Sequence, residues 1–96
     1  MGAVTIRLPT ALRRFSDGRA AVTLTLGPGA TVGGVLDALR DECPGVVDRV
    51  LDETGSIRRH VNVFVGDDNA RTAGGLAAPV PDGGEISILP AVSGGT

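Results

Sequence analysis

The feature that most constrains the fold is a single stretch of helical periodicity set between segments that alternate like β-strands. Its apolar residues recur at i, i+3, i+4 and i+7, and they are Val32, Val35, Leu36 and Leu39. This spacing places them on one face of a helix, and Thr31 stands before them as a good N-cap. Apolar and polar residues alternate on both sides of this stretch, which predicts strands with one buried face. The sequence therefore predicts an α+β domain with one main helix.

The strands expected from this alternation lie at residues 4–8, 22–26, 61–65 and 85–89. Residues 11–19 are expected to form a connecting loop, and Pro44-Gly45 is expected to end the helix before one short helical turn at 46–51. A turn is expected at residues 66–69, and residues 70–81 are interpreted as irregular, with room for one short strand. The order strand, strand, helix, strand, short strand, strand is that of a β-grasp, a mixed sheet of four to five strands with the helix across it. We expect one β-grasp domain at residues 1–90 and a flexible tail at residues 91–96.

The composition excludes several classes of function. The net charge is −2, and Phe15 and Phe64 are the only aromatic residues, which disfavours nucleic-acid binding by basic patches or stacked bases. All nine basic residues are arginine, so Schiff-base chemistry on lysine and a phosphate loop of the Walker type are excluded. One cysteine, no long apolar run and no signal-peptide pattern predict a cytoplasmic protein without a membrane segment.

The pair Gly94-Gly95 differs from the other glycine pairs of the chain by its position, because it follows the last strand and precedes only Thr96. Most glycine pairs are turns, but an extended tail without side chains can thread a narrow channel into the active site of another protein. The C-terminal carbonyl of a glycine is also open to attack. The tail is therefore a candidate reactive segment.

Two stretches carry a resemblance to a known family: residues 61–68, VNVFVGDD, and residues 82–95, DGGEISILPAVSGG. They resemble the ubiquitin-like sulfur carriers of the molybdopterin and thiamin pathways, the MoaD/ThiS family. Within that family they are most similar to the actinobacterial carriers of cysteine biosynthesis. The resemblance covers nearly the whole chain.

The resemblance implies a β-grasp fold and a function as a protein co-substrate rather than an enzyme. An E1-like enzyme, using ATP and magnesium, would adenylate the C-terminal glycine and convert it to a thiocarboxylate. The match places the thiocarboxylate on Gly95 and assigns Gly94 to tail threading. It assigns partner binding to Phe64, Leu89, Pro90, Ala91, Val92 and Ser93. The carrier itself would bind no metal and no cofactor; a sulfur-accepting synthase could use pyridoxal phosphate.

Thr96 departs from the family pattern, in which the second glycine is usually the last residue. A glycine in an amide bond cannot be adenylated, so the chain is interpreted as a precursor that a metallopeptidase cleaves between Gly95 and Thr96. The alternatives are a remnant of cloning and a tolerated neutral residue.

Several alternatives stay open at the sequence level. Cys43 is expected to be a packing residue and His60 a partly exposed residue before a strand, rather than a reactive thiol and a metal ligand. A non-catalytic ubiquitin-like adaptor competes with the carrier function. Cysteine synthesis is the first choice for the recipient of the sulfur, with molybdopterin, thiamin or a secondary metabolite as further candidates.

Overall fold

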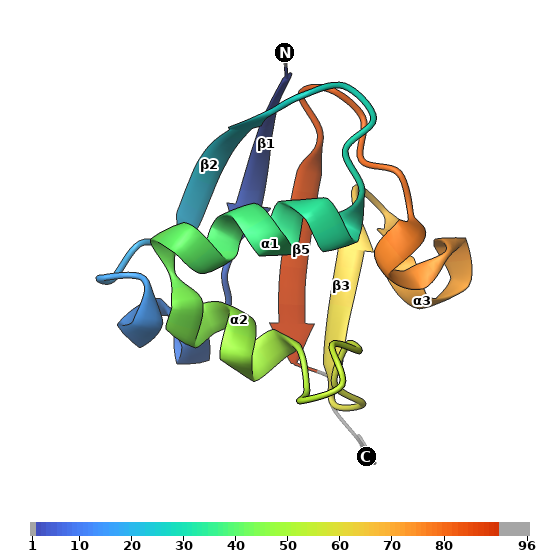
Figure 1. Cartoon of the computed structure of the whole chain (residues 1–96). Helices are drawn as coiled ribbons and strands as arrows, with labels where there is room; N and C mark the ends of the chain where they lie inside the picture. The colour runs from blue at the N-terminus through green and yellow to red at the C-terminus, as the bar shows by residue number, and fades with distance from the viewer. Residues whose placement is uncertain (1, 91–96) are drawn as a thin grey trace.

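The computed structural model describes residues 2–90, and the tail expected at residues 91–96 lies outside the described residues. Five strands form one mixed sheet in the order β2-β1-β5-β3-β4. The strands are β1 (Gly2–Arg7), β2 (Ala21–Leu26), β3 (Val61–Val65), β4 (Asp68–Asn69) and β5 (Glu85–Pro90). β5 lies between β1, to which it is parallel, and β3, to which it is antiparallel. Figure 1 shows the helices α1 and α2 across one face of this sheet, so the predicted β-grasp is confirmed.

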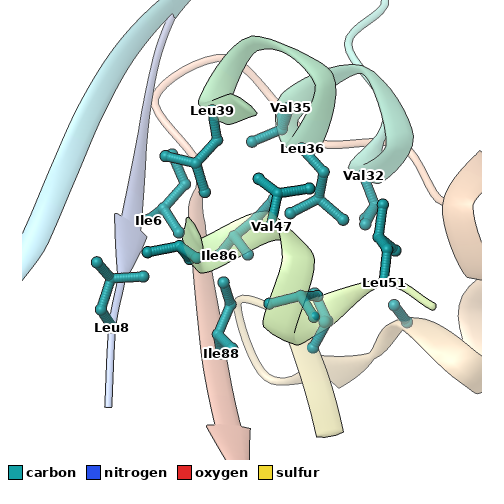
Figure 2. Close-up of a cluster of buried hydrophobic side chains, with 14 of the residues drawn as sticks. Ile6, Leu8, Val32, Val35, Leu36, Leu39, Val47, Leu51, Ile86 and Ile88 are labelled. Carbon is teal, nitrogen blue, oxygen red and sulfur yellow. The ribbon is translucent and has the colours of Figure 1, made fainter. Parts of the chain in front are cut away.

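The main helix, α1 (Val32–Glu42), follows the periodicity of its sequence. The hydroxyl of Thr31 accepts a hydrogen bond from the amide N–H of Gly34 at 3.1 Å, which confirms the expected N-cap. The four apolar residues at helical spacing are fully buried. Figure 2 shows them on the inner side of the helix, with Leu39 toward Ile6 of the sheet and Val32 beside Leu51. These contacts form the centre of the core.

The core of the described residues is aliphatic apart from one thiol. Its buried members are valine, leucine, isoleucine and alanine side chains together with Cys43, while Phe15 packs against the outside of the cluster. This agrees with the scarcity of aromatic residues in the sequence. Replacing one buried isoleucine or leucine by a smaller residue therefore removes much of the packing at that position.

Pro44 does not simply end the helical region, because it begins a second helix of seven residues, α2 (Pro44–Val50). Proline is favoured at the first position of a helix, where no backbone N–H is needed for an intrahelical hydrogen bond. Gly45 lets this helix approach the ring of Phe15: a Cβ at Gly45 would lie 2.7 Å from Cδ1 of Phe15. The close approach joins α2 to the segment after β1.

Two segments expected to be irregular form short helices instead. Residues expected as a loop at 11–19 contain the 3₁₀ helix η1 (Thr10–Phe15), and the stretch after β4 contains α3 (Ala70–Ala73) and η2 (Gly75–Ala77). Asn69, which was expected in a turn, ends β4 and accepts the N–H of Arg71 at 3.0 Å, so its side chain starts α3. Such short helices lack the repeated apolar spacing from which longer ones are predicted. No helix among residues 2–90 is long and apolar enough to cross a membrane.

Candidate functional site

The expected tail begins at the end of β5, a central strand of the sheet. Pro90 is the last described residue of this strand and lies opposite Val61 of β3. β5 pairs with β1 at residues 85–87 and with β3 at residues 86–90, so Pro90 is placed by its pairing with β3 alone. Ala91, Val92, Ser93, Gly94, Gly95 and Thr96 lie outside the described residues, and their expected roles stay predictions.

Phe64 and Leu89 lie on the sheet face opposite α1. Phe64 pairs with Ser87 and Leu89 with Asn62, while the intervening Val63 and Ile88 are buried in the core. Paired residues on neighbouring strands point to the same side, so the two apolar side chains share this open face. Because Phe64 alternates with Val63 and Val65, the sequence predicts an exposed aromatic residue on this face; Phe64 does lie on it but is half-buried. Leu89, at 45% exposure, is the exposed large hydrophobic residue of the described chain.

A salt bridge borders this apolar pair on the same face. Nε of Arg7 donates to Oε2 of Glu85 at 2.7 Å, and both side chains are largely exposed. Arg7 lies opposite Ser87, the residue that pairs with Phe64. An exposed ion pair contributes about 0–1 kcal/mol to stability, so it sets the polar border of the open face more than it holds the fold.

The other sequence candidates show no catalytic arrangement. Cys43 is buried, and a guanidinium nitrogen of Arg19 lies 3.4 Å from its sulfur, which agrees with a packing residue. His60 is exposed just before β3. Within residues 2–90 no three His, Cys, Asp or Glu side chains gather where they could hold a metal ion.

Asp52 shows how the loop before β3 is ordered. Its carboxylate accepts hydrogen bonds from the hydroxyl of Thr54 at 2.6 Å and from the backbone N–H groups of Thr54 and Ser56 at 2.8 and 3.1 Å. These donors, the Thr54 hydroxyl first, lower the pKa of Asp52. The carboxylate is engaged by its own loop and has a structural role.

Arg71 is a structural residue that the sequence did not indicate. Its guanidinium donates to the carbonyl oxygens of Arg58 at 2.7 Å, Arg59 at 3.1 Å and Val61 at 2.6 Å. One side chain thus fixes the backbone at the start of β3, opposite the end of β5. The contacts connect residues ten to thirteen positions apart, so no local motif could have revealed them.

Comparison with known proteins gives matches over nearly the full chain. The model of the ThiS family matches residues 6–95. The sulfur carrier protein CysO of Mycobacterium tuberculosis is 38% identical over 94 residues, which cover 96% of this chain and 98% of that protein. Small archaeal modifier protein 1 of Haloferax volcanii is 35% identical over 78 residues, covering 81% and 85% of the two chains.

Solved structures agree with the sequence matches. The crystal structure of Mycobacterium tuberculosis CysO superposes with a TM-score of 0.81 at 37% identity, covering 93% of this chain and 99% of that one. The BexX/CysO complex of Amycolatopsis orientalis gives a TM-score of 0.82 at 38% identity, covering 95% and 98%. The fold, the full-length family match and the similarity to CysO agree, and the chain belongs to the ThiS/MoaD family of ubiquitin-like sulfur carriers.

Proposed function

We propose that the working group of this carrier is the carboxylate of Gly95, freed by removal of Thr96 and converted to a thiocarboxylate. The observation that carries the proposal is the extent of the family match, which runs through Gly94 and Gly95 and stops one residue before Thr96. The pairing of Pro90 with Val61 at the end of β5 supports it, since a tail of five residues from there spans at most about 18 Å when extended. That reach suits delivery of the glycine into the active site of another protein.

The chemistry requires little from the carrier itself. A carboxylate oxygen of Gly95 attacks the α-phosphorus of ATP, and pyrophosphate leaves. A sulfur nucleophile then attacks the glycyl carbonyl carbon and displaces AMP. Glycine suits both steps because it carries no β-carbon that would obstruct attack on the carbonyl. The partner enzyme supplies the magnesium ion, the general bases and the sulfur donor.

The partners proposed for this chain follow from the same steps. They are an E1-like activating enzyme, a sulfur-accepting synthase and a metallopeptidase that trims the tail. A structurally similar CysO is found in complex with BexX, which supports docking of such a carrier on another protein. Cysteine synthesis by a pyridoxal-phosphate enzyme is the first recipient to test, followed by molybdopterin, thiamin thiazole and secondary metabolites.

Thiocarboxylation is tested by intact mass. We expect residues 1–95, incubated with ATP, magnesium, a sulfide source and an activating enzyme of this family, to gain about 16 Da as sulfur replaces oxygen on the acyl carbon. Omission of ATP is the control and should leave the mass unchanged. A protein that stays unmodified with a panel of such enzymes would favour the adaptor function instead, in which the domain binds partners without being activated.

Phe64 is expected to contribute to the binding of the activating enzyme through the open face of the sheet. Replacing Phe64 by alanine removes a half-buried aromatic side chain beside the exposed Leu89. We expect Phe64→Ala to weaken binding by about 1–3 kcal/mol, measured by titration calorimetry. Thermal unfolding of the same variant is the control. If stability collapses while the affinity of the folded fraction is unchanged, Phe64 belongs to the fold and not to the docking surface.

A further inference from the structure

A groove of about 500 Å³ lies beside the end of β5, and no sequence motif marked it. Its apolar part is formed by Leu12 of η1, Val61 of β3 and Ile88 of β5. Pro90, the last residue before the tail, also lines it. Figure 1 shows the blue segment after β1 and the helix α2 at the same end of the sheet as the arrowhead of β5. The groove is therefore next to the point from which the tail starts.

Basic side chains stand around this apolar part. Arg14 of η1 and Arg49 of α2 both place their guanidinium groups over the ring of Phe15, with Cζ 5.3 and 5.0 Å from the ring centroid. Arg58 and the exposed His60 line the groove from the segment before β3. Two guanidiniums on one ring are held in place without a carboxylate partner, because the ring face attracts each of them. Arginine stacks on aromatic rings better than lysine does.

Among the described residues, the groove lining contains no carboxylate that could pair with its basic side chains. Among residues 2–90, salt bridges join Arg7 to Glu85 and Arg19 to Glu42, and no carboxylate lies within salt-bridge distance of the groove arginines. Arg58 donates to the backbone carbonyl of Asp48 at 3.1 Å, and its charge also helps to lower the pKa of Asp52, so Arg14 and Arg49 are the less compensated charges of the groove. The charged side chains that line the groove are therefore all basic, although the chain as a whole has a net charge of −2.

We propose that this groove binds an acidic segment of the activating enzyme, in which carboxylates flank an apolar side chain. The identity of the partner rests on the proposed function, whereas the chemistry of the ligand rests on the groove. The apolar side chain would cover Leu12 and Val61, and the carboxylates would pair with Arg14 and Arg49. A protein that takes the tail into its active site must cover the surface around Pro90, and this surface includes the groove with Arg14 and Arg49.

The fixed geometry favours such docking over a loose electrostatic attraction. Arg14 and Arg49 are already ordered on Phe15, so little side-chain freedom is lost when a carboxylate arrives. Complementary charge also accelerates the encounter of two proteins and makes it sensitive to salt. The open face with Phe64 and the basic groove would then contact the same enzyme on two sides of β5.

The decisive comparison is between Arg49→Glu and Arg40→Glu. Both arginines are exposed and lie in the last turn of a helix, so the two substitutions change net charge and helix-dipole interactions alike. Only Arg49 of the two lines the groove. The probe is a fluorescent hexapeptide with four carboxylates around a central Leu-Phe pair, and its control is the same peptide with Asn and Gln in place of the acids. Anisotropy at low and high salt measures its binding to residues 1–95, and the activating enzyme is titrated against the same variants.

We expect wild-type protein to bind the acidic peptide and not the amide control, and the peptide to compete with the activating enzyme. Arg49→Glu should weaken both interactions at least about tenfold, and Arg40→Glu by less than about twofold. Equal weakening by the two variants would show that only net charge matters and would overturn the proposal. Absence of peptide binding, or tighter binding of a single-stranded oligonucleotide, would overturn it as well. If the peptide binds but does not compete, the activating enzyme is not the partner. Failure of thiocarboxylation in the separate mass assay would leave the peptide result standing.

Discussion

Full-length protein is expected to be inert toward the activating enzyme, and removal of Thr96 is expected to switch activation on. An amide between Gly95 and Thr96 has no free glycyl carboxylate to attack ATP, and its carbonyl is a poor nucleophile. The comparison uses residues 1–96 and 1–95 with the same enzyme and follows ATP-dependent pyrophosphate release together with intact mass. We expect release near background for 1–96 and full thiocarboxylation for 1–95. A zinc peptidase is the proposed trimming agent, because its metal-bound water can attack an unhindered glycyl carbonyl.

Two controls separate the position of the carboxylate from the identity of the last residue. Thr96→Ala keeps one residue after Gly95 and should stay inert. Residues 1–94 end on a glycine as well but shorten the tail by one residue, so their activation should fall well below that of 1–95. Equal activity of 1–96 and 1–95, with Thr96 still present in the product, would show that the carboxylate used is not that of Gly95.

The second large effect is expected in the core of the sheet. Ile88 of β5 is 1% exposed and lies beneath the helices, as Figure 2 shows. We expect Ile88→Ala to lower the free energy of unfolding by about 2–5 kcal/mol, because it removes buried methyl groups and leaves a cavity. For a domain whose total stability is about 5–15 kcal/mol, this loss leaves a substantial unfolded population under mild stress. In urea denaturation this loss of stability is expected as a lower midpoint concentration, with an unchanged dependence of the unfolding free energy on urea concentration.

Leu89→Ala is the matched control for Ile88→Ala. The two residues are neighbours on one strand, but Leu89 lies on the open face at 45% exposure. We expect Leu89→Ala to change the free energy of unfolding by less than about 1 kcal/mol while weakening the binding of the activating enzyme. Similar destabilisation by both substitutions would contradict the division of β5 into a core face and a docking face.

The elements with repeated periodicity were predictable from sequence. The helix at Val32–Glu42 and the strands around Val63 and Ile88 depend on apolar spacings of 3.6 and 2, which local sequence records directly. The mixed sheet followed from the order of these elements. The face on which Phe64 lies was predictable for the same reason, since Val61 and Val63 occupy the other side. The family resemblance added the roles of Gly94, Gly95 and Thr96, which remain predictions.

The local sequence could not decide the details that depend on contacts between distant segments. Phe64 is half-buried, which its alternation with core residues did not predict, and Arg71 holds the start of β3 through backbone carbonyls that no sequence spacing marks. The groove beside Pro90 draws its residues from η1, α2, the segment before β3 and the end of β5. Its charge exists only because the fold brings Arg14 and Arg49 onto one ring. Sequence thus determined the main helix and the longer strands, and the family match made the tail the place to look for the carrier's working group. Tertiary packing alone decided which side chains lie around Pro90, where the tail begins. Hydrophobic burial, and not proximity along the chain, sets which segments become neighbours.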